Sequence, residues 1–295
     1  MCRKNKLIIG IVILCVAVLG FFFYPKTERM SIVFACSDSY VPHVGTAMTS
    51  ILMNADKDDK FDFYILQDDI SEENKQKFEE LKRIKDFNIK FISVNPDRFK
   101  DLKIKHLSRH TYYRYIIPEI IRGKKALYLD ADVIIKKSLK KLYNTDISNF
   151  FAAAVQDIDS VSHISRLSLK NYVNAGVLLL NLEKMRKDNI TEKLFKITTT
   201  FQTEPWFHQR DQDGLNVVFN DNILLLPLEY NDFTEINNQK TVIFHFIHLW
   251  KPVTKVSEAS KVYWHYRQLS PWAKEKHPIA IKNKTTEYLW IKDKR

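Results

Sequence analysis

Apolar and polar positions divide the chain into a short N-terminal part and a long body. Residues 7–23 form an unbroken apolar run of 17 residues, and the first six positions are rich in Lys and Arg. A helix of this length would span about 26 Å, close to the hydrocarbon thickness of a bilayer. The pattern predicts a cytosolic stub (1–6), a transmembrane signal-anchor (7–24) and a short stem (25–30), and a cleaved secretory signal is the alternative.

From residue 31 onward, short runs rich in β-branched and aromatic residues alternate with segments whose apolar residues have helical spacing. The strand-type runs cover residues 31–36, 61–67, 88–94, 126–130, 151–156, 174–182 and 242–246. A helical stripe follows the first run, and Ser71 is predicted to cap the next helix. This order predicts an α/β fold with a Rossmann-like, doubly wound, mostly parallel sheet. We expect one domain over residues 31–255 and a basic, aromatic, helical C-terminal tail over residues 256–295.

Two carboxylates follow one of these strands, where ligands bind in open α/β sheets. Asp130 and Asp132 are separated by one residue, so both can turn toward one Mg²⁺ or Mn²⁺ ion, which prefers oxygen ligands. An ordinary acidic turn is one alternative. A membrane-anchored phosphatase of the haloacid dehalogenase type, with Asp130 as nucleophile, is another, and Asp157 and Asp159 would be its downstream acidic pair. That class carries its motif near the start of the domain, whereas here it comes about 100 residues into it.

Three further segments carry polar residues suited to a ligand. His245 ends an apolar strand and can complete a metal site, and Lys251 can hold a phosphate as a point charge. A core histidine bonded to the backbone is the alternative for His245. The polar residues of segment 210–216 (RDQDGLN) either face a ligand or form the capped start of a helix. In NAGVLLLNL, Gly176 has no side chain, so other groups can approach its backbone closely.

Composition narrows the class of protein only slightly. The chain has 295 residues, of which 45% are apolar and 27% charged, as in globular proteins. Three cysteines, of which Cys36 alone lies in the body, exclude a disulfide scaffold and a cysteine-based zinc cluster. The formal net charge of +11 suggests an anionic partner such as nucleic acid, a membrane surface or a phosphorylated small molecule, so a non-catalytic basic binding module is a further alternative.

Six motifs together resemble glycosyltransferase family 8, which includes glycogenin and the galactosyl- and glucosyltransferases of bacterial lipopolysaccharide. They are IVFACSDSY, HTYYR, YLDADV, NAGVLLLNL, DQD and a histidine followed six residues later by Lys-Pro, and they occur in the family's order over about three quarters of the chain. The resemblance implies a GT-A type fold and a retaining glycosyltransferase. Such an enzyme moves a hexose or pentose from a UDP-sugar to a glycan, glycoprotein or glycolipid acceptor with Mn²⁺ or Mg²⁺, and it has no nucleic acid partner.

The resemblance also implies roles for individual residues. The metal ligands would be Asp130, Asp132 and His245. The donor-binding positions would be Ala35, Cys36, Asp38, Tyr40, Asp130, Ala131, Asn174, Ala175 and Lys251. The catalytic candidates would be Arg114, Asp211 and Gln212.

The chain departs from the family pattern at two motifs. Where the nucleoside loop often reads S-D-D-N-Y, this chain has Ser37-Asp38-Ser39-Tyr40, and in the C-terminal motif His248 replaces a glycine and Val253 a tryptophan. Retention could proceed by double displacement, with a nucleophile at Asp211 or Gln212, or by front-side substitution. The anchor places the enzyme in the Golgi or endoplasmic reticulum lumen if eukaryotic, or on a bacterial inner membrane with a cytosolic domain.

Overall fold

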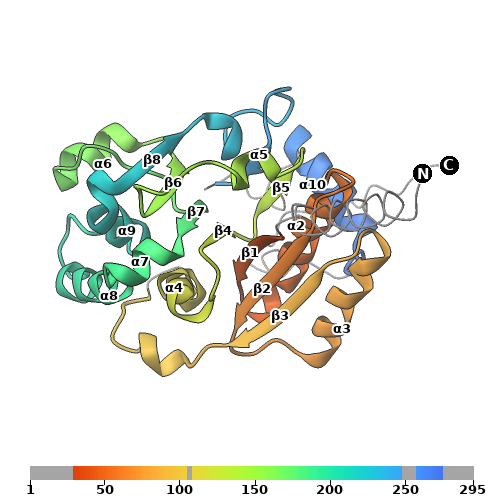
Figure 1. Ribbon diagram of the computed structural model, residues 1–295, viewed down its shortest axis with the longest axis horizontal. Helices are drawn as coiled ribbons and strands as arrows, with labels where there is room; N and C mark the ends of the chain where they lie inside the picture. The colour runs from red at the N-terminus through yellow and green to blue at the C-terminus, as the bar shows by residue number, and fades with distance from the viewer. Residues whose placement is uncertain (1–28, 105–107, 248–256, 275–295) are drawn as a thin grey trace, which may run out of the picture.

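Seven strands form the central sheet of the computed structural model, which describes residues 29–104, 108–247 and 257–274 (Figure 1). In spatial order they are β3 (Asn88–Ser93), β2 (Phe61–Gln67), β1 (Met30–Ala35), β4 (Lys125–Leu129), β7 (Val177–Asn181), β6 (Ala152–Val155) and β8 (Ile223–Leu226). Four neighbouring pairs are parallel, and β7 runs antiparallel to both β4 and β6. The sheet is therefore mostly parallel, as predicted, with one reversed strand that the sequence pattern did not indicate.

Helices cover both faces of this sheet (Figure 1). On one side lie α2 (Val41–Met53), α3 (Glu72–Glu80) and α10 (Glu258–Leu269), and on the other α4 (Ile117–Ile120), α7 (Leu182–Lys187), α8 (Ile190–Phe201) and α9 (Asp211–Phe219). Two short helices, α5 (Lys140–Tyr143) and α6 (Ser160–Leu167), lie at the periphery. The 3₁₀ turns are Asp38–Tyr40, Leu81–Arg83, Pro96–Phe99, Arg109–Ile116, Asn220–Asn222 and Leu228–Tyr230.

Alternate residues of the strands feed two separate apolar clusters. In β4, Leu127 and Leu129 pack with α2 and α3, whereas Ala126 and Tyr128 pack with the helices on the opposite face. This follows from the two-residue period of a strand, and a strand buried on both faces reads as a continuous apolar run. At the start of α3 the Ser71 hydroxyl accepts from the backbone nitrogen of Asn74, which confirms the predicted cap.

The run at residues 242–246 does not join the central sheet. It forms β9 (Ile243–His245), which pairs antiparallel with β5 (Val133–Ile135) in a separate two-stranded sheet. The strand predicted at residues 174–182 also begins later than expected, because β7 starts at Val177 and leaves Asn174 in the loop before it. Both differences matter for function, since they place His245 and Asn174 beside the end of β4.

The C-terminal segment packs back onto the first half of the chain. Helix α10 lies against α2, and the Trp272 side chain is fully buried between α2 and α3, where its ring meets Phe78 with centroids 4.9 Å apart. A Cβ atom at Gly45 would lie 2.1 Å from the Trp272 ring, so only glycine leaves room for it. The Trp272 indole nitrogen donates to Asn74 at 2.7 Å.

The predicted membrane placement, in the Golgi or endoplasmic reticulum lumen or on a bacterial inner membrane, is corrected by the structure. None of the helices within residues 29–104, 108–247 and 257–274 combines the length and apolar character needed to cross a bilayer. Residues 7–23, on which the anchor was predicted, lie outside the described residues.

Candidate active site

Asp130, Asp132 and His245 come together at the carboxyl end of β4. The two aspartates follow the strand directly, and the pairing of Val133 with His245 brings the histidine beside them. Its Nε2 lies 3.3 Å from Oδ1 of Asp132 and 3.9 Å from Oδ2 of Asp130. One potential ligand atom from each residue lies within 4.8 Å of the others, so all three can reach one cation.

A chain of side-chain amides sets the proton position on His245. The Asp157 carboxylate only accepts, so Asn174 turns its Nδ2 toward Asp157 Oδ2, at 3.1 Å. The Asn174 Oδ1 then accepts from Asn231 Nδ2 (2.9 Å), which leaves the Asn231 Oδ1 to accept from His245 Nδ1 (3.0 Å). The His245 ring therefore carries its proton on Nδ1 and directs the Nε2 lone pair at the two aspartates.

This donor set fits a divalent cation. Two carboxylates and an imidazole lone pair that face one another repel unless a positive charge lies between them, and oxygen with one nitrogen suits Mn²⁺ or Mg²⁺. Burial lowers the pKa of His245, which favours the neutral ring that a metal ligand requires. Asn231 is fully buried and was not identified from the sequence, where nothing in LPLEYN distinguishes it from a turn residue.

Gly176 allows these residues to approach one another. A Cβ atom there would lie 2.2 Å from Cε1 of His245 and 2.8 Å from Oδ2 of Asp130. The backbone oxygen of Gly176 also accepts from the Asp130 nitrogen at 2.8 Å. The close approach expected from the sequence is confirmed, and it serves the acid–histidine group itself.

Arg114 contacts Asp130 and is surrounded by hydrogen-bond acceptors. Its Nη2 donates to Asp130 Oδ1 at 3.0 Å, its Nη1 donates to the Ala175 oxygen, and its Nε lies 3.3 Å from Asp211 Oδ2. The guanidinium also stacks over the Tyr128 ring, 4.5 Å from the centroid. Only 4% of Arg114 is exposed, and its guanidinium contacts Asp130 and Asp211.

Asp211 and Gln212, which begin α9, point in different directions. Asp211 is buried against Arg114, and burial raises the pKa of its carboxyl despite the opposing charge of the arginine. Gln212 accepts from the Ala175 nitrogen (2.9 Å) and donates to Asp157 Oδ2 (3.2 Å). Arg210, which precedes them, has φ of 55° and makes no side-chain cap, so tertiary contacts and not a local cap set this helix start.

One cavity of about 160 Å³ joins these side chains. Its walls include the two metal-candidate aspartates, His245, Asn174 and Gln212, together with Asp157, His163 and Gln209. Asp211 and Arg114 are not among the residues that line it. The phosphatase alternative cast Asp157 as one of a distant acidic pair, whereas the structure makes it the hydrogen-bond partner of Asn174 and Gln212.

The predicted nucleoside loop lies after β1. The Asp38 carboxylate accepts from the backbone nitrogen and hydroxyl of Ser71 and from Asn74 Nδ2, and these bonds lower its pKa although burial opposes them. Burial raises the pKa of the Cys36 thiol, which faces the core. Ala35 is half-buried, and Tyr40 is 37% exposed, so of these positions Tyr40 presents the most side-chain surface.

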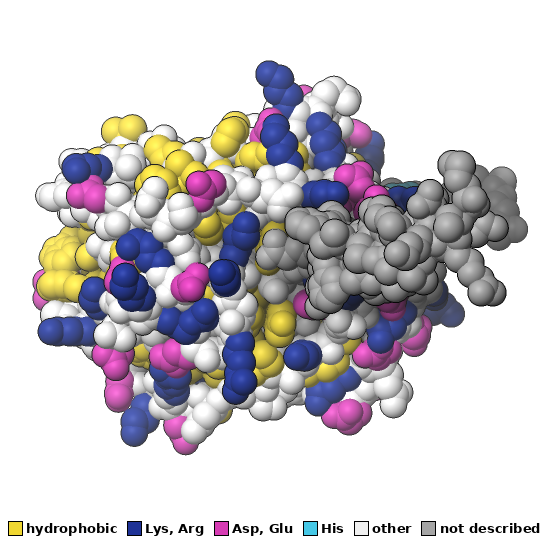
Figure 2. Space-filling model, viewed as in Figure 1, with side chains coloured by type: hydrophobic (Ala, Val, Ile, Leu, Met, Phe, Trp, Pro, Cys, Tyr) yellow, Lys and Arg dark blue, Asp and Glu magenta, His cyan; other side chains and the backbone are white. Residues whose placement is uncertain are grey.

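The remaining predicted positions do not line the cavity or lie outside the described residues. Ala131 is partly buried against the core. Lys251, His248 and Val253 lie outside the described residues. On the visible face in Figure 2, Lys and Arg side chains are scattered among Asp and Glu.

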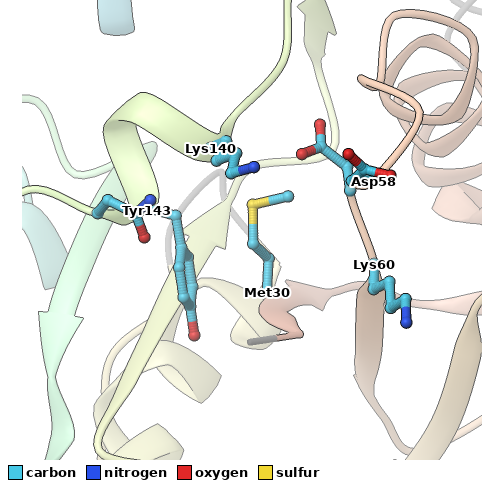
Figure 3. Close-up of a pocket in the computed structure, with 7 residues that line it drawn as sticks. Met30, Asp58, Lys60, Lys140 and Tyr143 are labelled. Atoms are coloured by element: carbon cyan, nitrogen blue, oxygen red, sulfur yellow. The ribbon is translucent and has the colours of Figure 1, made fainter. Parts of the chain in front are cut away.

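A second, smaller cavity of about 70 Å³ lies at the opposite end of β1, where that strand begins. Figure 3 shows Lys140 and Tyr143 of α5 on one side of Met30, with Asp58 and Lys60 on the other. It contains none of the residues singled out from the sequence.

Comparisons with known proteins identify the family and the fold of the chain. A model of glycosyl transferase family 8 matches residues 31–255. General stress protein A of Bacillus subtilis is 29% identical over 218 residues, which cover 72% of this chain and 76% of that protein. Lipopolysaccharide 1,2-glucosyltransferase of Escherichia coli K12 is 27% identical over 272 residues, covering 83% and 80%. The crystal structure of galactosyltransferase LgtC with donor and acceptor sugar analogues superposes with a TM-score of 0.70 at 25% identity, covering 82% of this chain and 96% of that one. The α/β fold is thus GT-A-like.

Proposed function

Because the chain belongs to glycosyl transferase family 8, we propose that it is a retaining enzyme that transfers a hexose or pentose from a UDP-sugar to a glycan or glycolipid acceptor. The single observation that carries this proposal is the cavity in which Asp130, Asp132 and the His245 lone pair face one another across from Gln212. The two alternative functions, a phosphatase and a non-catalytic binding module, give His245 no role.

The first step is donor binding. Asp130, Asp132 and His245 would hold a divalent cation, which when bound offsets the negative charge of the departing diphosphate. Arg114 holds the Asp130 carboxylate in place, so its contribution is to orient a ligand. Lys251 is proposed to contact the diphosphate as a point charge, on the strength of the family resemblance.

The second step is transfer at the anomeric carbon. Asp211 is buried against Arg114, and Gln212 is an amide, which is a poor nucleophile, so neither suits a covalent intermediate. We therefore favour front-side substitution. The bond from the anomeric carbon to the diphosphate oxygen breaks, the acceptor oxygen bonds to the same face, and the acceptor proton passes to the departing phosphate oxygen. Gln212, fixed by Ala175 and Asp157, orients the sugar.

A donor panel tests the proposal. The full chain is incubated with Mn²⁺ and UDP-glucose, UDP-galactose, UDP-N-acetylglucosamine or UDP-xylose, and released UDP is measured with and without simple sugar acceptors. We expect slow hydrolysis of a preferred donor and loss of that activity on chelation. Absence of UDP release from every donor would contradict the proposal.

A variant of Gln212 separates sugar handling from nucleotide binding. Gln212→Ala should leave UDP affinity within about twofold and lower UDP release about tenfold, because the lost contact acts mainly on the transition state. A helix-start role alone would leave turnover near normal. Calorimetric titration with UDP and steady-state kinetics provide the two readouts.

A further inference from the structure

His163 of α6 lies on the cavity wall with its ring held on two sides. The ring packs against Tyr172 with centroids 4.4 Å apart, and its Nδ1 lies 3.1 Å from Nη2 of Arg166. Asp213 in turn accepts from both terminal nitrogens of Arg166, at 2.9 and 2.8 Å. His163 as a whole residue is 6% exposed, and it lines the cavity. Its position is therefore set by the buried Tyr172 and the partly buried Arg166, yet one edge of the ring faces the cavity.

The partner of Nδ1 decides what the other nitrogen does. An arginine guanidinium only donates, so Nδ1 of His163 must accept and the neutral ring carries its proton on Nε2. This Nε2–H faces Oδ1 of Asp157 at 3.9 Å, which is too long for a direct hydrogen bond. Within the described residues, no other group accepts from it. A donor and an acceptor thus face the cavity with a gap between them.

The same reasoning excludes a second metal site. Asp157, Asp159 and His163 could each offer a ligand atom within 4.8 Å of the others. However, Nε2 of His163 carries a proton and Arg166 places a positive charge beside the ring, so the group lacks the lone pair that a cation would need.

We propose that His163 is a specificity-determining residue, and that its Nε2–H and Asp157 Oδ1 together bind one sugar hydroxyl in the cavity. This inference rests on the proposed function. A hydroxyl oxygen about 2.8 Å from each atom fits between them, and a hydroxyl is suited to the gap because it can accept from His163 and donate to Asp157 through one atom. The hydroxyl can belong to the donor sugar or to the acceptor. Arg166 is a positioning residue that fixes the proton on Nε2.

Two substitutions of His163 separate hydrogen-bond donation from shape. In His163→Gln the amide nitrogen reaches about as far as Nε2 and keeps a donor at the cavity. In His163→Asn the shorter amide ends near the position of Nδ1, so the cavity loses its donor. His265→Asn on the exposed side of α10 is the matched control. Thermal unfolding and UDP titration of each variant check that fold and nucleotide binding are retained.

The assay uses UDP-glucose and UDP-galactose together with their 2-, 3-, 4- and 6-deoxy analogues. If the hydroxyl belongs to the donor, kcat/KM for hydrolysis should fall about tenfold or more in His163→Asn and stay within about threefold in His163→Gln. One deoxy analogue should be rejected about tenfold or more by the unmodified enzyme, and this discrimination should fall below about threefold in His163→Asn.

If the hydroxyl belongs to the acceptor, hydrolysis stays unchanged and only transfer to lactose or glucose falls in His163→Asn. The inference is overturned if both variants match the unmodified enzyme in hydrolysis and transfer, or if Gln is as impaired as Asn. An unmodified enzyme that hydrolyses and transfers from no donor would overturn the proposed function, and the inference with it.

Discussion

Two groups of two aspartates and one histidine lie beside the same cavity, and all of these residues except Asp159 line it. The two groups differ in what holds the histidine. In one, Nδ1 of His245 donates to Asn231, so Nε2 offers a lone pair to Asp130 and Asp132. In the other, Nδ1 of His163 accepts from Arg166, so Nε2 carries a proton that faces Asp157 Oδ1 across a gap of 3.9 Å. The two groups contain the same residue types at similar distances from one another, yet one is suited to bind a cation and the other a hydroxyl.

The hydrogen-bond partner of Nδ1 therefore determines whether Nε2 of a histidine carries a proton or a free lone pair. When Nδ1 donates to an amide oxygen, Nε2 is free to act as a metal ligand, and when Nδ1 accepts from a guanidinium, Nε2 acts as a hydrogen-bond donor. The amide chain from Asn231 ends on Oδ2 of Asp157, and Oδ1 of the same carboxylate faces Nε2 of His163. Asp157 therefore connects the two groups.

The largest effect is expected from Asp132→Asn. The change keeps the shape of the side chain and removes the charge of a proposed ligand, so UDP release should fall about 100- to 1000-fold. Mn²⁺ binding, measured by the loss of the free-ion electron paramagnetic resonance signal, should weaken in parallel while the circular dichroism spectrum is unchanged. Retained Mn²⁺ binding would contradict the assignment.

A somewhat smaller effect is expected from Asn231→Leu. The substitution removes the acceptor of the His245 Nδ1–H and lets the imidazole turn or shift its proton to Nε2. Loss of such a partner typically costs about 10- to 100-fold in metal affinity. Mn²⁺ titration provides the measurement, and an affinity equal to that of the unmodified protein would show that the amide chain does not govern His245.

Gly176→Ala should disturb the group of Asp130, Asp132 and His245 by steric overlap alone. The added methyl would meet His245 and Asp130, and overpacking of this kind costs about 1 to 3 kcal/mol of stability. Denaturant unfolding measures this cost, and Mn²⁺ titration should show weaker binding because two of the three ligands must move. A variant with unchanged stability and unchanged Mn²⁺ affinity would show that the backbone yields there.

The smallest effect is expected from Asp159→Asn, the counterpart of the first change in the other group. Asp159 is exposed and belongs to a group that we assign to hydroxyl binding, so Mn²⁺ affinity should stay within about twofold. Equal losses in Asp159→Asn and Asp132→Asn would mean that the two groups are not distinct.

Much of the fold is visible in short-range patterns. The run at residues 61–67 is β2 with the same bounds, and Ser71 with Glu72 and Glu73 marks the start of α3. Asp130, Asp132 and His245 could be singled out because each follows or ends an apolar strand, where ligand-binding residues gather. The direction of β7 could not be read, since a strand buried on both faces shows the same apolar run whichever way it lies.

Local sequence patterns were enough to identify the α/β alternation, the acidic pair after β4, His245 and Gly176. The pairing of β9 with β5, the contacts of Arg114 with Asp130 and Asp211, and the contacts of the two histidines with Asn231 and Arg166 became visible only in the folded chain. Strand periodicity, helix caps and turns depend on neighbours within a few residues, so they leave a local pattern. A hydrogen bond between residues far apart in the chain leaves none, and the position of a ring proton depends on such bonds alone.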